Sequence, residues 1–269
     1  MINFLTAYIA TIIFVFGTVI GSFLNVLIYR LPIGMDFKLG KSMCTTCKHE
    51  LAWYDLFPLF SWIFLSGKCR YCKAKISSRY PIVEALNGAM YVLVYLFLSG
   101  GNAIEGLNLS LVGYMVVVSC LIVTAWIDFE HQIIPDSMWI SIFVGGVLIV
   151  ADALINHSFT KEFIISKVIG FFAVSLLFFL IGVISKGAWM GGGDVKLMAA
   201  AGFVLGWKAV IVSLFLGAFA GVLFSIIRKI VSKKEMSGVI PFGPFLAIGV
   251  AVSLFVGEYI FNLYLNMFI

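Results

Sequence analysis

The chain has 269 residues, of which 62% are hydrophobic and 12% are charged, and its mean hydropathy is +1.10. A soluble domain carries about a quarter charged residues, so this composition excludes an ordinary soluble protein and indicates a polytopic membrane protein. The net charge of +5 does not point to a nucleic-acid partner, because the basic residues lie in loops where membrane topology would place them.

The expected elements are transmembrane helices, each of which needs about 20 apolar residues to cross the hydrocarbon core. The first apolar segment lacks a basic leader, so it is predicted to be a retained span rather than a cleaved signal peptide. A shorter segment at 195–206 could by its length be a re-entrant or tightly packed helix. Because it follows a run of glycines, it is counted as a span of its own, giving an all-α fold of about eight transmembrane helices. The seven longer segments lie at about 4–28, 81–99, 108–127, 137–155, 163–184, 208–227 and 241–268.

Lys and Arg are concentrated in the loops at 30–80 and 228–237, whereas Lys161 and Lys167 only flank a short loop near 156–162. The positive-inside rule places the two basic loops in the cytoplasm. With eight spans, both termini then lie outside. The predicted divisions are a first span at 1–29, a cytoplasmic loop domain at 30–80 and a transmembrane domain at 81–269.

The cytoplasmic loop contains two C-x-x-C pairs, Cys44/Cys47 and Cys69/Cys72, separated by 21 residues. Four thiolates arranged in this way are typical of a structural zinc site, which predicts a small zinc-ribbon-like domain. A redox dithiol or two disulfides are the alternatives, and a cytoplasmic location argues against disulfides. Cys120 lies inside an apolar span and is expected to be a small buried hydrophobe.

Two acidic residues lie at the edges of apolar segments. Asp128 follows its segment without a turn and is expected to stay on the helix end, while Asp194 follows Gly191, Gly192 and Gly193 and is expected to cap the next helix. The predicted topology brings both to the cytoplasmic face. Two adjacent carboxylates share one proton, so one can act as a base and the other as an acid when water attacks a peptide carbonyl.

Simpler interpretations of these segments stay open. The three glycines can form a flexible loop that ends in an ordinary helix cap. Asp136, which follows Pro135 and precedes an apolar run, is also predicted to be a helix N-cap.

Several motifs along the chain resemble, in order, those of bacterial type IV prepilin peptidases, a family of GxGD aspartic proteases. The double C-x-x-C loop and the GxGD stretch ending at Asp194 belong to this set. The combination is specific, although GxGD alone is a weak match that presenilin-like proteases share. The other motifs are Gly21-Ser22-Phe23-Leu24-Asn25-Val26 with Tyr29-Arg30-Leu31-Pro32, Arg79-Tyr80-Pro81-Ile82-Val83-Glu84, Ile134-Pro135-Asp136 after Asp128, and Pro241-Phe242-Gly243-Pro244.

The resemblance implies a bifunctional enzyme of the bacterial inner membrane. Asp128 and Asp194 would be the catalytic aspartates of an endopeptidase that removes the basic leader of type IV prepilins or pseudopilins at the cytoplasmic face. The cysteine loop would belong to an N-methyltransferase that uses S-adenosylmethionine, and Gly67, Lys68 and Glu84 match positions linked to that activity. The residues expected to shape the peptidase site are Gly191, Gly192, Gly193, Pro135, Pro241 and Gly243.

One departure from the family pattern is Asp55-Leu56-Phe57-Pro58, where relatives usually have an asparagine and a small aliphatic residue before the proline. It is expected to alter loop packing rather than cleavage. Other functions stay open at this stage. The chain could be a peptidase without methyltransferase activity, or a transporter whose aspartates relay protons or bind cations. It could also be an assembly factor without catalytic activity.

Overall fold

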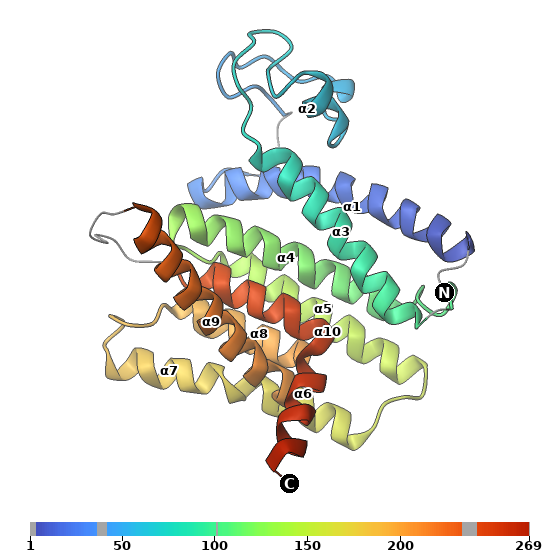
Figure 1. Cartoon of the computed structure of the whole chain (residues 1–269), viewed down its shortest axis with the longest axis vertical. Helices are drawn as coiled ribbons and strands as arrows, with labels where there is room; N and C mark the ends of the chain where they lie inside the picture. The colour runs from blue at the N-terminus through green and yellow to red at the C-terminus, as the bar shows by residue number, and fades with distance from the viewer. Residues whose placement is uncertain (1–3, 37–41, 101, 233–240, 269) are drawn as a thin grey trace. The chain divides into compact units, whose positions relative to one another are not determined.

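The computed structural model describes residues 4–36, 42–100, 102–232 and 241–268 (Figure 1). These residues form helices joined by loops, with two isolated β-bridges and no strand in the described part of the chain. Seven helices are long and apolar enough to cross a membrane. The predicted all-α polytopic fold is therefore confirmed.

The chain divides into two compact units, Met1–Leu111 and Val112–Ile269. The first unit contains two long helices that pack on each other, and the loop between them carries the cysteines. Its elements are α1 (Phe4–Arg30), η1 (Leu31–Ile33), η2 (Trp53–Asp55), α2 (Phe60–Phe64) and α3 (Arg79–Ser99).

Helices α1 and α3 approach closely because glycines lie at their crossing. A Cβ added at Gly17 would come within 2.7 Å of the Gly88 Cα, and one added at Gly21 within 2.7 Å of the Glu84 Cα. The close approach of the helices also allows a hydrogen bond between them, in which Nδ2 of buried Asn87 donates to the Gly17 carbonyl oxygen at 2.7 Å. Small residues and interhelical amide bonds are the usual means of helix packing in membranes, where lipid removes the hydrophobic driving force.

The second unit is a bundle of membrane-type helices around a short central helix, α8. Helix α4 begins three residues before the unit boundary, and α6 and α7 together form one candidate span, Lys161–Ile184, interrupted at Val174. The helices are α4 (Leu109–His131), α5 (Asp136–Ile155), α6 (Lys161–Ala173), α7 (Ser175–Ile184), α8 (Gly192–Leu205), α9 (Trp207–Ser232) and α10 (Gly243–Phe268).

Helix α8 corrects the predicted count of eight spans. Its 14 residues cover about 21 Å at 1.5 Å per residue, which is less than the ~30 Å hydrocarbon core. It is not among the seven candidate spans, and α5, α6, α7, α9 and α10 all contact it. The predicted alternation of sides counted this segment as a crossing, so the placement of both termini outside stays a prediction.

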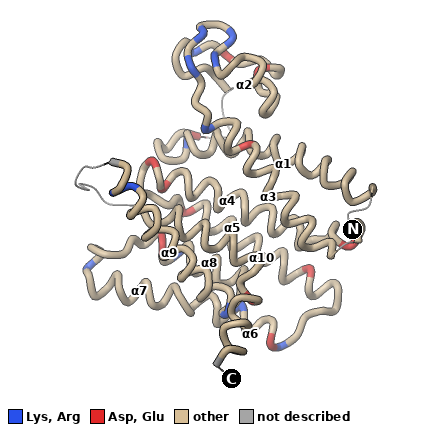
Figure 2. The backbone as a smooth tube through the Cα atoms, viewed as in Figure 1, with Lys and Arg blue, Asp and Glu red and all other residues tan. Residues whose placement is uncertain are grey.

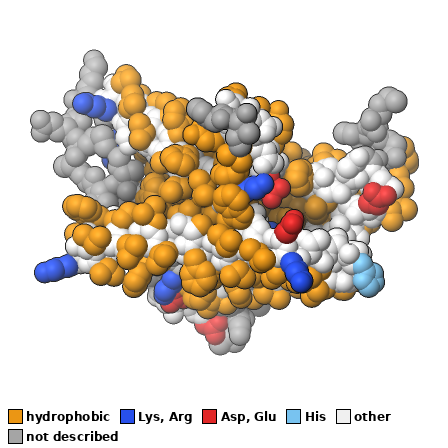
Figure 3. Space-filling view, turned by 90° about the horizontal axis from the view of Figure 1, so that it is seen from below, with side chains coloured by type: hydrophobic (Ala, Val, Ile, Leu, Met, Phe, Trp, Pro, Cys, Tyr) orange, Lys and Arg blue, Asp and Glu red, His pale blue; other side chains and the backbone are white. Residues whose placement is uncertain are grey.

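Charged residues are sparse along the helices and gather near their ends and in the loop that contains α2 (Figure 2). The face of the molecule in Figure 3 is covered mainly by hydrophobic side chains. An exposed apolar surface of this extent is typical of a membrane-facing protein. Residues of α6 and α7 that expose large apolar side chains are Ile165, Ile169, Phe172, Leu176, Phe179 and Val183.

Candidate functional site

Asp128 lies in the last turn of α4, as the sequence predicts, and is only 7% exposed. Its Oδ2 accepts a hydrogen bond of 2.9 Å from the backbone N–H of Gly243, the first residue of α10. The N-terminus of a helix offers unpaired N–H groups and a partial positive charge, which favour a carboxylate. The end of α4 and the start of α10 are therefore joined through this aspartate.

Asp194 lies in the first turn of α8 and is half-buried. The prediction that it is the N-cap is wrong, because the extended N-cap residue is Gly191 and the helix begins at Gly192. Burial and the nearby charge of Asp128 raise the pKa of Asp194 to about 6, and the N–H of Gly191 partly opposes this shift. The two predicted aspartates therefore lie close enough for the charge of Asp128 to act on Asp194.

The three glycines before Asp194 have different surroundings. A Cβ added at Gly193 would come within 2.9 Å of the Ile134 side chain, whereas one added at Gly192 would meet nothing within 4 Å. Gly193 is therefore required for close packing against the Ile134-Pro135 segment. Gly192 is exposed and leaves the backbone beside Asp194 open to another chain.

Asp136 is the first residue of α5 rather than its N-cap, which is Pro135. Its Oδ1 accepts a bond from the indole Nε1 of Trp139 at 2.9 Å and pairs with Lys196 Nζ at 2.6 Å. Lys196 is two residues after Asp194 on α8, so this exposed ion pair ties the start of α5 to the start of α8. Sequence reasoning missed Lys196, because nothing in its spacing connects it to Asp136.

Pro241 and Phe242 directly precede Gly243, and the Phe242 ring lies 6.2 Å from that of Phe178 in α7. Within this segment, Gly243 is the residue at which a side chain would collide with Asp128. A Cβ there would come within 2.7 Å of Asp128 Oδ2 and within 2.9 Å of its carboxyl carbon. The glycine is thus needed for the hydrogen bond that holds Asp128.

Gly243→Ala should lower the leader cleavage that the resemblance implies roughly 10- to 100-fold, since a displacement of about 1 Å at a reacting group can cost that much. Cleavage of a prepilin by the purified variant measures the effect. Gly182→Ala in α7 is the matched control, because its added Cβ would lie 3.7 Å from the nearest atom. Wild-type cleavage by Gly243→Ala would contradict the placement of Asp128 in the site.

The two C-x-x-C segments fold in the same way. In each, the N–H of the first cysteine bonds to the carbonyl five residues later, from Cys44 to His49 at 3.0 Å and from Cys69 to Ala74 at 2.8 Å. The carbonyl of each first cysteine accepts from the residue four positions on, Lys48 or Lys73, and both lysines have left-handed backbones (φ 59° and 61°). Each segment is therefore a tight knuckle that points two thiols inward.

The four thiols of these knuckles form one cluster, with all Sγ atoms within 4.8 Å of one another and no disulfide. The Cys44 and Cys72 Sγ atoms lie 3.8 Å apart. Four Zn–S bonds of about 2.3 Å in a tetrahedron would place neighbouring sulfurs about 3.8 Å apart. The residues therefore fit a tetrahedral metal ion.

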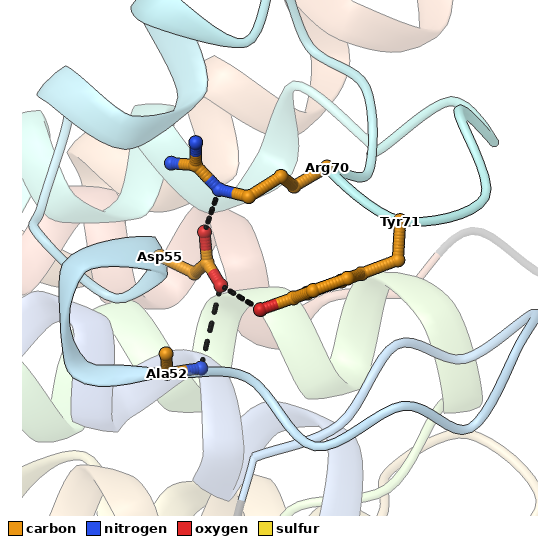
Figure 4. A network of polar contacts seen from close by, with 4 residues as sticks. All are labelled: Ala52, Asp55, Arg70 and Tyr71. Atoms are coloured by element: carbon orange, nitrogen blue, oxygen red, sulfur yellow. Dashed lines mark hydrogen bonds and ion pairs between the residues drawn. The ribbon is translucent and has the colours of Figure 1, made fainter.

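Asp55 connects the polar side chains of the second knuckle to the preceding loop (Figure 4). Its carboxylate accepts from Arg70 Nε at 2.7 Å, from Tyr71 Oη at 3.0 Å and from the N–H of Ala52 at 3.3 Å. Burial opposes ionisation of this carboxyl, which is 3% exposed, but these bonds outweigh it and hold its pKa below the usual value. Asp55 thus uses both carboxylate oxygens to hold the second knuckle against the preceding loop.

The residues predicted for the methyltransferase have structural contacts within the first unit. Glu84 is buried, and its Oε2 accepts the N–H of Leu59 at 2.8 Å. Leu59 (φ 62°, ψ −53°) forms a strained γ-turn, in which Phe60 N–H bonds to Pro58 O at 2.7 Å. Glu84 thus supports a strained turn, and direct contact of Glu84 with a methyl donor stays a prediction.

Gly67 (φ 66°) lies beneath the indole of Trp62, whose Nε1 donates to Ile76 O at 3.2 Å. A Cβ at Gly67 would come within 2.9 Å of the Trp62 ring. Lys68, the next residue, pairs with Lys75 in the bridge that closes the second knuckle. Both residues therefore shape this knuckle.

Gly67→Ala should destabilise the cysteine domain by about 1–3 kcal/mol through backbone strain and the clash with Trp62. We expect faster metal loss to a chelator and weaker methyl transfer, with leader cleavage retained. Gly34→Ala is the matched control, since Gly34 has the same φ of 66° but nothing within 4 Å of its added Cβ. Equal metal retention in both variants would contradict the packing role of Gly67.

The fold and site define a class of protein, namely a polytopic membrane protein with two interacting carboxylates at helix ends and a separate four-cysteine cluster. Residues 15–98 match the family described as Bacterial Peptidase A24 N-terminal domain, and residues 115–226 match the Type IV leader peptidase family. The chain belongs to the type IV leader peptidase family.

Curated relatives are similar over nearly their whole length. The prepilin leader peptidase/N-methyltransferase of Aeromonas salmonicida (strain A449) is 31% identical, over 95% of this chain and 94% of the relative. The proteins of that name from Aeromonas hydrophila and Stutzerimonas stutzeri are each 31% identical, over 96% and 94% of this chain and 94% and 92% of the relative. No solved structure matches this chain.

Proposed function

We propose that this membrane enzyme removes the leader of type IV prepilins or related pseudopilins through Asp128 and Asp194 and then methylates the new N-terminus. The observation that carries the peptidase part is the placement of these carboxylates in the last turn of α4 and the first turn of α8, within reach of each other's charge. Relatives named prepilin leader peptidase/N-methyltransferase support both activities. Because the chain belongs to a peptidase family, we prefer this function to the alternative that the chain is a transporter.

The two aspartates would divide the proton transfers of peptide hydrolysis between them. The ionised member takes a proton from water, which attacks the peptide carbonyl, while the neutral member protonates the carbonyl oxygen. The intermediate then collapses, the C–N bond breaks and the leaving amine takes a proton from the pair. The N–H of Gly243 stabilises the ionised form of Asp128, and the raised pKa of Asp194 suits the neutral partner.

The substrate backbone would approach beside Gly192, where the structure leaves space. Gly193 holds the start of α8 against Ile134, so Asp194 is presented from a packed helix rather than from a loose loop. Pro135, Pro241 and Gly191 bound the same region from the chain segments next to α5, α10 and α8. The three glycines are therefore proposed to act in packing and substrate access together.

The four cysteines would hold zinc as a structural ion, because the cluster has four thiols and no further ligand is needed for a closed tetrahedron. S-adenosylmethionine, when bound, would supply the methyl group. Gly67, Lys68 and Glu84 remain the residues proposed for this activity. Glu84 and Gly67 also hold the domain in shape, through Leu59 and Trp62.

We further propose that the chain lies in the bacterial inner membrane with the cysteine domain and the aspartates facing the cytoplasm. The basic residues of the loop between α1 and α3 support this orientation. The placement of both termini outside follows from the eight-span count and stays a prediction. Labelling of single cysteines placed at either terminus with a membrane-impermeant reagent tests it.

The proposed function is tested by incubating the purified protein with a prepilin and S-adenosylmethionine and analysing the product by mass spectrometry. We expect loss of the leader and the addition of one methyl group at the new N-terminus. Cleavage without methylation would leave a peptidase alone. An unchanged prepilin would refute the proposal.

A further inference from the structure

Lys167 is a buried cation in the middle of α6 that the peptide chemistry does not use. Only 7% of it is exposed. Its Nζ donates a hydrogen bond to the carbonyl of Val204, in the last turn of α8, and lies 5.1 Å above the ring of Phe163. The charge of Glu258, on α10, also acts on it. Burying a charged side chain within a membrane span costs free energy. We therefore expect the bond between Lys167 and its partner to have a functional role.

The partner of Lys167 is the C-terminal end of α8, where backbone carbonyls have no donor within the helix. Helix α8 ends at Leu205, and α9 begins at Trp207 after the single residue Gly206 (φ 84°). The last four carbonyls of a helix have no intrahelical donor, and the N–H of Gly206 supplies only the carbonyl of Gly202. Because α8 is too short to cross the hydrocarbon core, this end has to be satisfied by the protein. A cation at the C-terminal end of a helix also interacts favourably with the helix dipole.

Backbone packing fixes α6 and α8 at the same level. Gly170, one turn after Lys167, and Gly202, less than one turn before Val204, approach so closely that a Cβ on either would collide with the carbonyl oxygen of the other. Ser166 likewise borders Gly206. The lysine bond and the glycine contact therefore act on the C-terminal end of α8 together.

We infer that Lys167 is a positioning residue for the peptidase site, which fixes the depth and rotation of α8 by binding its C-terminal carbonyl. Asp194 and Val204 are ten residues apart on this one helix, so a shift at one end moves the other, about 15 Å away. The Lys196–Asp136 pair provides a second polar anchor, at the start of α8. The inference rests on the proposed role of Asp194.

The test compares Lys167→Met, which keeps the apolar stem and loses the donor, with Lys167→Arg, which keeps a cation. In Lys167→Met we expect kcat for leader cleavage to fall roughly 10- to 100-fold with KM within about twofold, and Lys167→Arg to recover most of the rate. Methyl transfer to an already cleaved pilin should stay unchanged, because Lys167 lies outside the first unit. Lys161→Met, an exposed lysine of the same helix, is the control and should behave as wild type.

Amide hydrogen exchange gives a second measurement that does not depend on activity. Lys167→Met should speed exchange in residues 197–205 and leave α10 unchanged. Unchanged exchange in α8, an unchanged kcat, or a parallel loss of cleavage and methyl transfer would each overturn the inference. Failure of the proposed function looks different, because Asp194→Asn would then still cleave the prepilin while exchange in Lys167→Met continued to report on α8.

Discussion

Asp128→Asn and Asp194→Asn are each expected to lower leader cleavage by about 10²- to 10⁴-fold, the usual contribution of a general acid or base. An amide cannot take a proton from water or give one to the carbonyl oxygen, although it keeps the size of the carboxyl. Each purified variant is incubated with a prepilin and the rate of leader removal is measured. Methyl transfer to an already cleaved pilin should remain, because both residues lie in the second unit.

Glu162→Gln provides the control for these variants, since it removes an exposed carboxylate at the start of α6. Its cleavage rate should equal that of the wild type. A normal rate in either aspartate variant would remove that residue from the catalytic pair. Loss of both cleavage and methyl transfer would instead indicate a misfolded protein.

Cys69→Ser should abolish metal binding by the cysteine cluster and, with it, methyl transfer. Structural zinc contributes folding free energy directly, about 10–16 kcal/mol in small zinc domains, and the loop of this protein has little other core. Elemental analysis of the purified protein should give one zinc per chain in the wild type and none in the variant. Leader cleavage is expected to persist, because the aspartates lie in the other unit.

Cys120→Ser is the matched control, since Cys120 is buried in α4, in the second unit, and is not one of the four clustered cysteines. It should keep the zinc and both activities. A wild-type protein prepared without chelator that contains no zinc would contradict the metal assignment. Zinc retained by Cys69→Ser would contradict the four-cysteine ligand set.

The sequence predicted the long helices because their apolar runs are determined locally, and each is found within a few residues of its expected place. The two aspartates were predicted for a related reason, since a carboxylate beside an apolar run is rare and costly. Their proximity depends on packing between α4, α8 and α10. It could only be inferred from topology and resemblance, and the bond from Gly243 to Asp128 has no counterpart in the sequence.

Other features depend on contacts that no local pattern encodes. The partners of Asp55 lie 15 and 16 residues away, and they meet it only once the second knuckle has formed. Lys167 was assigned to the flank of a loop because it follows Lys161 closely, yet α6 begins at Lys161 and carries Lys167 into the bundle. The length of the segment at 195–206 left a re-entrant or packed helix open, but its hydropathy could not decide the matter, because its sequence is as apolar as a true span.

The two knuckles affect the order in which the parts of this protein fold during synthesis. Every backbone bond of a knuckle joins residues no more than nine positions apart, as from Leu51 to Ser42 and from Ile76 to Gly67, and local contacts of this kind form fastest. The loop also leaves the ribosome before α3. Each knuckle can therefore close during synthesis, and the metal can join the two before the second membrane helix is inserted.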